Sequence, residues 1–221
     1  GLIRNHQSTI FKAQSPGSTT EAPTANEETV LITGGYGSAG FLSSTEIYPA
    51  VSGCSPPALP EGRSGHSTFA TTGASPKLVT CGGYVRGYTA SCLVMTEQVW
   101  SQSMIGQLPH PRVWHAAVSV ENIGTYLIGG ALSNNARTTD FLGASSTQWV
   151  AGPAILVRMN RPCAVKISSQ SFIIIHGTHI LEYEVDITDP TAVAGGKAPP
   201  NGLDCKQAGE GIQDAARLEI T

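Results

Sequence analysis

Short runs of apolar residues, each ending at a pair of glycines, recur along this chain at nearly constant spacing. They read LITGG at 31–35, LVTCGG at 78–83 and YLIGG at 126–130, and a fourth run, FIIIHG at 172–177, has His176 in place of the first glycine. The second glycines, Gly35, Gly83, Gly130 and Gly177, are 48, 47 and 47 residues apart. Short apolar runs bounded by turn residues are typical of β-strands. The pattern therefore predicts an all-β chain built from a repeated unit.

An arginine and a tryptophan follow the same period. Arg63, Arg112 and Arg161 are each 49 residues apart, as are Trp100 and Trp149, and His66 and His115 each come three residues after an arginine. From Val51, Trp100 and Trp149 the next arginine is always 12 residues away, whereas the intervals around the glycine pairs vary. Fixed intervals indicate buried strands and the crossing between units, and variable ones indicate surface loops. We therefore expect the arginines, histidines and tryptophans to have structural roles in each unit.

Four short strands are predicted in each unit. The first follows the arginine, as in HSTFAT at 66–71, HAAVSV at 115–120 and CAVKIS at 163–168, and the second is the apolar run into the glycine pair. The third is predicted at 44–48, 92–96, 139–142 and 179–185, and the fourth around the tryptophans. Four short antiparallel strands per unit is the composition of one blade of a β-propeller.

These landmarks resemble the kelch repeat, in which an apolar run into a glycine pair is followed by Tyr and Trp positions, then by Leu-Pro, an arginine and a histidine. The resemblance implies a kelch-type β-propeller. Its strand ends would carry the glycine pairs Gly34–Gly35, Gly82–Gly83 and Gly129–Gly130, and Trp100 and Trp149 would lie between adjacent blades. About four units are present, fewer than is usual in the family, although propellers in general have about four to eight blades. We therefore expect a fragment, a four-bladed ring, or a partial ring that closes by self-association.

The repeated units do not cover the whole chain. Residues 1–12 are predicted to be a degenerate strand of the first blade, residues 13–29 a Ser-, Thr- and Pro-rich insertion or linker, residues 30–198 the blades, and residues 199–221 a C-terminal tail. Tracts of this composition without periodicity are typical of loops and linkers.

Composition and charge exclude several classes of partner. The net charge is −3 and the 13 Lys and Arg residues are scattered, so we expect no nucleic-acid footprint. The longest apolar run, 172–175, is far shorter than a membrane span, and no membrane span is expected. No nucleophile elbow, phosphate-binding glycine loop or paired metal-ligand motif occurs in the chain, and His176 and His179 form only a weak H-x-x-H pattern. We expect no catalytic residue, no metal and no cofactor.

Cysteine spacing bears on the compartment. Cys81 lies in the strand that enters a glycine pair and Cys92 opens the next strand, so the two can face each other in a hairpin and form a disulfide. Packing as reduced thiols in the core is the alternative. The pairing of Cys54, Cys163 and Cys205 stays open. A disulfide favours an extracellular or secreted location, with a cytoplasmic one as the alternative.

The loops after the glycine pairs carry the residues that we expect to bind a partner. Aromatic and arginine side chains anchor protein interfaces, and these variable loops are rich in them. The candidate partner-binding residues are Tyr36, Phe41, Tyr84, Arg86, Tyr88, Asn134, Asn135 and Arg137. The leading hypothesis is a non-enzymatic protein–protein interaction module whose partner the sequence does not name. The alternatives are a secreted galactose-oxidase-like or other kelch-fold enzyme, and a structural extracellular repeat segment of a larger protein.

Overall fold

The computed structural model describes residues 7–11, 29–48, 55–96, 99–102, 104–131, 136–186, 188–191 and 194–197. In these ranges the regular secondary structure consists of β-strands, which form four antiparallel sheets. The all-β prediction is therefore confirmed. The predicted insertion up to residue 28, the predicted tail 199–221, and Val51, Cys54, Asn134, Asn135 and Cys205 lie outside the described residues. No helix that could cross a bilayer is found in the described part of the chain.

Each sheet is a meander of strands that are consecutive in the sequence. The first sheet comprises β1 (Gln7–Phe11), β2 (Thr29–Gly37) and β3 (Gly40–Tyr48). The second comprises β4 (Ser67–Ala70), β5 (Leu78–Cys81), β6 (Cys92–Thr96) and β7 (Val99–Ser101). The third comprises β8 (Ala116–Val120), β9 (Gly124–Ile128), β10 (Thr139–Gly143) and β11 (Val150–Ala151). The fourth comprises β12 (Cys163–Lys166), β13 (Ser171–His176), β14 (His179–Glu184) and β15 (Ala194–Lys197).

The strands coincide with those expected from the apolar runs. β4, β8 and β12 follow the arginine landmarks, and β5, β9 and β13 are the runs into the glycine pairs. In β9 every residue is buried, with Tyr126 and Ile128 in one apolar cluster and Leu127 in another. Because successive side chains of a strand point to opposite faces, this sheet is covered on both sides.

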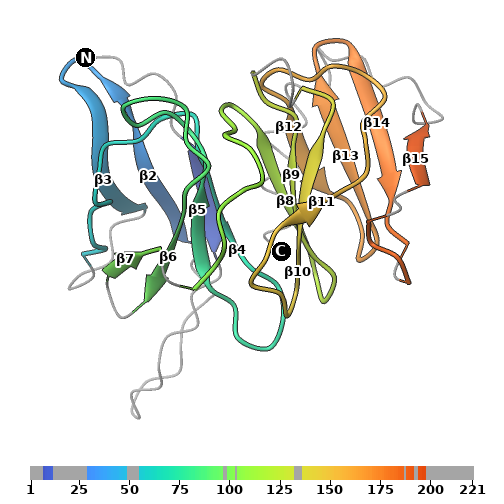
Figure 1. The fold of residues 1–221 in the computed structure, drawn as a ribbon, viewed down its shortest axis with the longest axis horizontal. Helices are drawn as coiled ribbons and strands as arrows, with labels where there is room; N and C mark the ends of the chain where they lie inside the picture. The colour runs from blue at the N-terminus through green and yellow to red at the C-terminus, as the bar shows by residue number, and fades with distance from the viewer. Residues whose placement is uncertain are drawn as a thin grey trace.

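The sheets succeed one another as layers, from the blue β1–β3 to the orange β12–β15 (Figure 1). One apolar cluster joins the second and third sheets through Val79, Val94, Leu127 and Leu142. Another joins the third and fourth sheets, where the ring centroids of Tyr126 and Phe172 are 5.4 Å apart. The first strands of successive sheets contact each other, β1 with β4, β4 with β8 and β8 with β12. Each sheet is thus held by the one before it, along its first strand and across its face.

Candidate interaction surface

The glycine pairs fasten each sheet to the segment that leads into the next. Gly35 N donates to Arg63 O at 2.7 Å and Gly83 N donates to Arg112 O at 2.7 Å. The first glycine of each pair has a positive φ, 55° at Gly34 and 68° at Gly82, and a Cβ there would lie 2.5 Å from the same arginine carbonyl. Only glycine tolerates both the positive φ and the close approach of the arginine carbonyl. The repeated contact places the loops after the glycine pairs at the same end of successive sheets.

In the third unit the predicted landmark is wrong by two residues. Gly130 N donates to the carbonyl of Met159 at 2.9 Å, so Met159, and not Arg161, takes the position of Arg63 and Arg112. Pro162 packs against Gly129 where His66 packs against Gly34, so Pro162 takes the position of the histidines in this unit. The interval from Trp149 to this position is therefore 10 residues and not 12. The residue at this position need not be an arginine, because the glycine pair binds a backbone carbonyl, which every residue type supplies. The segment that crosses between the sheets can therefore be two residues shorter in this unit and still make the contact.

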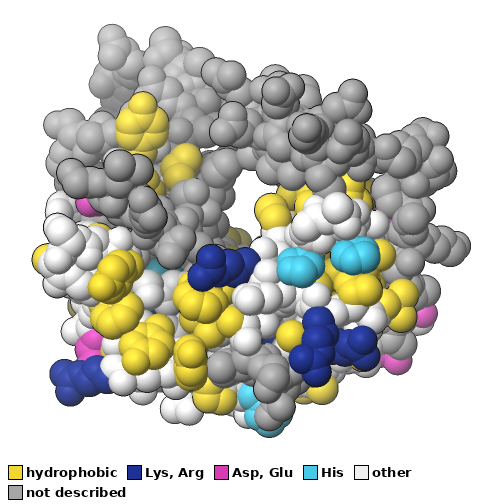
Figure 2. All heavy atoms as spheres, turned by 90° about the horizontal axis from the view of Figure 1, so that it is seen from above, with side chains coloured by type: hydrophobic (Ala, Val, Ile, Leu, Met, Phe, Trp, Pro, Cys, Tyr) yellow, Lys and Arg dark blue, Asp and Glu magenta, His cyan; other side chains and the backbone are white. Residues whose placement is uncertain are grey.

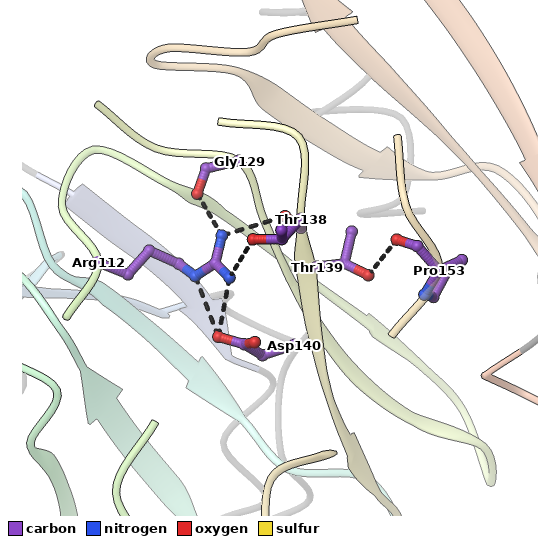
Figure 3. A network of polar contacts seen from close by, with 6 residues as sticks. All are labelled: Arg112, Gly129, Thr138, Thr139, Asp140 and Pro153. Carbon is purple, nitrogen blue, oxygen red and sulfur yellow. Dashed lines mark hydrogen bonds and ion pairs between the residues drawn. The ribbon is translucent and has the colours of Figure 1, made fainter. Parts of the chain in front are cut away.

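Arg63 and Arg112 hold the loops that follow the glycine pairs. Arg63 Nη1 donates to Gly82 O at 2.7 Å and to Ser91 O at 3.1 Å, the two ends of the loop between β5 and β6. Arg112 makes the same contacts in the next sheet, to Gly129 O and Thr138 O, and its Nη2 lies 2.9 Å from Asp140 Oδ2 (Figure 3). Burial lowers the pKa of Arg63 to about 10, so the guanidinium stays charged at neutral pH.

His66 and His115 lie in the contact between successive sheets and are almost entirely buried. His66 Nε2 is hydrogen-bonded to Thr33 Oγ1 of the preceding sheet at 2.9 Å. Burial, together with the charge of Arg63, lowers the pKa of His66 to about 3, and burial beside Arg112 lowers the pKa of His115 well below its usual value. Both imidazoles are therefore neutral in the folded protein at physiological pH.

The two predicted tryptophans pack against the connections between sheets. Trp100 lies in β7, clusters with Leu59 and donates from Nε1 to Pro57 O at 3.0 Å. Trp149 belongs to the same apolar cluster as Leu108, and its ring meets that of Phe69 in the preceding sheet at 6.1 Å, edge to face. Each buried aromatic ring thus covers the segment by which the chain passes between neighbouring sheets.

Four of the predicted binding residues form one continuous row of rings, which we call the aromatic strip: Tyr36, Phe41, Tyr84 and Tyr88. Tyr36 and Phe41 are paired across β2 and β3, with ring centroids 5.3 Å apart. Phe41 lies 5.2 Å from Tyr84 of the second sheet, and Tyr84 lies 5.4 Å from Tyr88. Tyr36, Phe41 and Tyr88 are 50%, 40% and 52% exposed. Rings this exposed and this close together form an apolar surface that crosses two sheets.

The two predicted arginines lie in the loops that follow the glycine pairs of the second and third sheets. Arg86 is almost fully exposed, and its guanidinium is 3.7 Å from the Glu61 carboxylate. Such an exposed pair contributes little to stability, so Arg86 can exchange this partner for another. Arg137 is exposed in the third sheet's loop. Figure 2 views the molecule from above relative to Figure 1; hydrophobic side chains gather mainly on the left, and His side chains together with Lys or Arg side chains lie at the centre and right, beside further hydrophobic ones.

The predicted disulfide is confirmed and closes the loop that carries Tyr84 and Tyr88 of the aromatic strip. Cys81 and Cys92 are directly opposite in β5 and β6 and are bonded through their sulfurs. The bond joins the two ends of the loop that Arg63 also holds. Cys163 is a free, exposed cysteine.

Removing this bond with Cys81→Ala and Cys92→Ala is expected to lower the free energy of unfolding by about 3 kcal/mol, the loop-closure entropy for a loop of this length. Urea titration of the double variant against the wild type measures the change. The variant Cys163→Ala removes one thiol without opening a loop, and it should unfold at the wild-type urea concentration. Equal stability of all three proteins would contradict the role given to the bond.

The structure also brings a tryptophan and an arginine into contact, and the repeat pattern did not predict this contact. The Arg161 guanidinium carbon lies 4.1 Å from the centroid of the Trp114 ring, and Arg161 N donates to Trp114 O at 3.1 Å. Both residues have positive φ, 53° and 60°. Gly65 has the same sign of φ and its O accepts from Trp114 N, so these three residues occupy one position in successive units. These three residues are of different types, so the sequence alone does not show that their positions are equivalent.

His176 and His179 lie opposite each other at the end of β13 and β14. His176 Nε2 accepts a hydrogen bond from Asn160 N at 3.3 Å. Among the residues that the structure describes, no three His, Cys, Asp or Glu side chains come close enough to hold a metal ion. Comparison with protein-family models finds no match to this chain, and comparison with the curated proteins finds none either.

Proposed function

We propose that the chain is a kelch-type propeller module that binds a protein partner through the aromatic strip. The unit-to-unit contact from glycine pair to arginine carbonyl, repeated in Gly35–Arg63 and Gly83–Arg112, supports the propeller assignment. So do the contacts between the first strands of successive sheets, which the inner strands of propeller blades make. The disulfide between Cys81 and Cys92 supports an extracellular or secreted location.

The observation that carries the binding function is the continuity of the aromatic strip. A monomer gains nothing by leaving four neighbouring rings partly in water, whereas tyrosine and phenylalanine are among the residue types that anchor interfaces. The strip is also preorganised, because Arg63 and the disulfide hold both ends of the loop that carries Tyr84 and Tyr88. A rigid apolar surface loses little conformational entropy when it binds a partner.

The test is to select binding peptides from a phage-displayed random library on the immobilised protein and to measure their affinity for variants. Tyr36→Ser with Tyr88→Ser is expected to weaken the selected peptides by about tenfold or more, since both rings lose their apolar contact area. Both side chains are half exposed, so the melting temperature should stay within a few degrees of the wild type.

Tyr48→Ser is the matched control for this experiment. Tyr48 is 69% exposed and lies at the far end of β3, seven residues beyond Phe41 of the aromatic strip. Its loss should leave peptide affinity unchanged. Selected peptides that bind the Tyr36→Ser, Tyr88→Ser variant as tightly as the wild type would refute the aromatic strip as the binding surface.

A further inference from the structure

The aromatic strip is linked through the backbone to a set of exposed basic residues on the third and fourth sheets. Tyr84 is bridged to Ser64 through its backbone, and Gly65 follows directly. The ring of Trp114 lies against Gly65, where a Cβ would come within 2.7 Å of its Cδ1. The guanidinium of Arg161 then covers the Trp114 ring at 4.1 Å. The backbone of Ser64 and Gly65 therefore links the aromatic strip to the stacked indole and guanidinium of Trp114 and Arg161.

We call the basic residues of this region the basic edge: Arg137, Arg158, Arg161, His176 and His179. Arg137, Arg158, Arg161 and His179 are exposed. Backbone contacts bring their segments together, since Arg137 O accepts from Ile155 N at 3.0 Å and Asn160 N donates to His176 Nε2 at 3.3 Å. The right part of the face in Figure 2 shows His side chains and Lys or Arg side chains, and the Asp and Glu side chains of the described residues are visible only at the margins.

The arginines of the basic edge have no carboxylate partner in the described part of the chain. The ion pairs found there are Arg86–Glu61 and Arg112–Asp140. The chain as a whole has a net charge of −3, so an uncompensated group of three arginines is not a consequence of its composition. Unpaired cations gathered beside an apolar surface complement a ligand that carries negative charge beside apolar groups.

We propose that the basic edge binds an acidic segment, rich in Asp and Glu, of the same protein partner whose apolar residues cover the aromatic strip. This inference rests on the proposed function and adds the chemistry of the partner. Arg161 is the centre of the site, because stacking on Trp114 fixes the guanidinium before the ligand arrives. Arg137 and Arg158 attract the acidic segment over longer distances, an effect that salt screens.

The experiment compares peptides selected from the phage-displayed random library on the wild type and on the variant with Arg158→Gln and Arg161→Gln. Wild-type selections should be enriched in Asp and Glu next to aromatic or aliphatic residues, and selections on the variant should keep the apolar residues and lose the acidic enrichment. Peptides selected on the wild type should bind the variant roughly tenfold more weakly at low salt, and the difference should shrink in high salt.

The matched control is the variant with Lys77→Gln and Lys166→Gln, which removes the same charge. Lys77 directly precedes β5 and Lys166 ends β12, so both lie at the strand ends away from the glycine pairs and Arg161, and this variant should behave as the wild type. Wild-type peptides that need the aromatic strip but show no acidic enrichment would overturn this inference and leave the proposed function intact. Peptides that do not need the strip would refute the proposed function itself. Tight, Arg161-dependent binding of a single-stranded oligonucleotide, without acidic peptides, would also overturn the inference.

Discussion

Lowering the pH from 7 to about 4.5 is expected to reduce the free energy of unfolding by about 3 kcal/mol through His66 alone. In the unfolded chain a histidine binds a proton below about pH 6.5. In the folded protein burial, and then the charge of Arg63, lower the pKa of His66 to about 3. Between these values the unfolded chain holds more protons than the folded one, so stability falls as the pH falls. His115, whose pKa is lowered in the same way, acts in the same direction.

Urea unfolding at a series of pH values isolates this effect when His66→Gln is compared with the wild type. Glutamine retains a hydrogen-bonding group near Thr33 and does not titrate, so the variant should lose about 1.4 kcal/mol less stability for each pH unit between 6 and 4. Parallel curves for His66→Gln and the wild type would show that His66 is protonated in the folded state.

Arg112→Met is expected to lower the free energy of unfolding by about 3–5 kcal/mol, the cost of breaking a buried ion pair by removing one member. The substitution leaves the Asp140 carboxylate, whose side chain is 5% exposed, without its cation. The carbonyls of Gly129 and Thr138 also lose the guanidinium that binds them (Figure 3). Methionine fits this position in the next unit, where Met159 lies fully buried, so steric misfit is not the cause of the loss.

Denaturant titration of Arg112→Met and of Arg86→Met measures this difference. Arg86 also pairs with a carboxylate, but this ion pair is exposed to solvent, so Arg86→Met should lower the free energy of unfolding by less than about 1 kcal/mol. Adding Asp140→Leu to Arg112→Met should recover part of the loss, because the unpaired buried charge is then gone. If both arginine variants were equally stable, the buried pair would have no special part in holding the third sheet's loop.

The strands and their pairing could be predicted from the chain because their causes are local. An apolar run such as LVTC or YLI, closed by glycines, has few alternatives to a short buried strand, and the short links between strands make consecutive ones pair. The disulfide was predictable for the same reason, since Cys81 and Cys92 lie at the two ends of one loop. The aromatic strip followed from residue type, because solvent-exposed loops after a structural glycine pair leave their aromatic rings available to a partner.

The contacts between units were less predictable, because they join residues 28 to 49 positions apart and depend on the length of every loop between them. A connection shorter by two residues put Met159 where the spacing had indicated Arg161. The same shift placed the Arg161 guanidinium on Trp114, and so created the centre of the basic edge. Local sequence thus fixed which segments became strands and which side chains faced outward. Only the packing of whole sheets on one another decided which distant residues met, because a backbone contact across sheets accepts any side chain at that position.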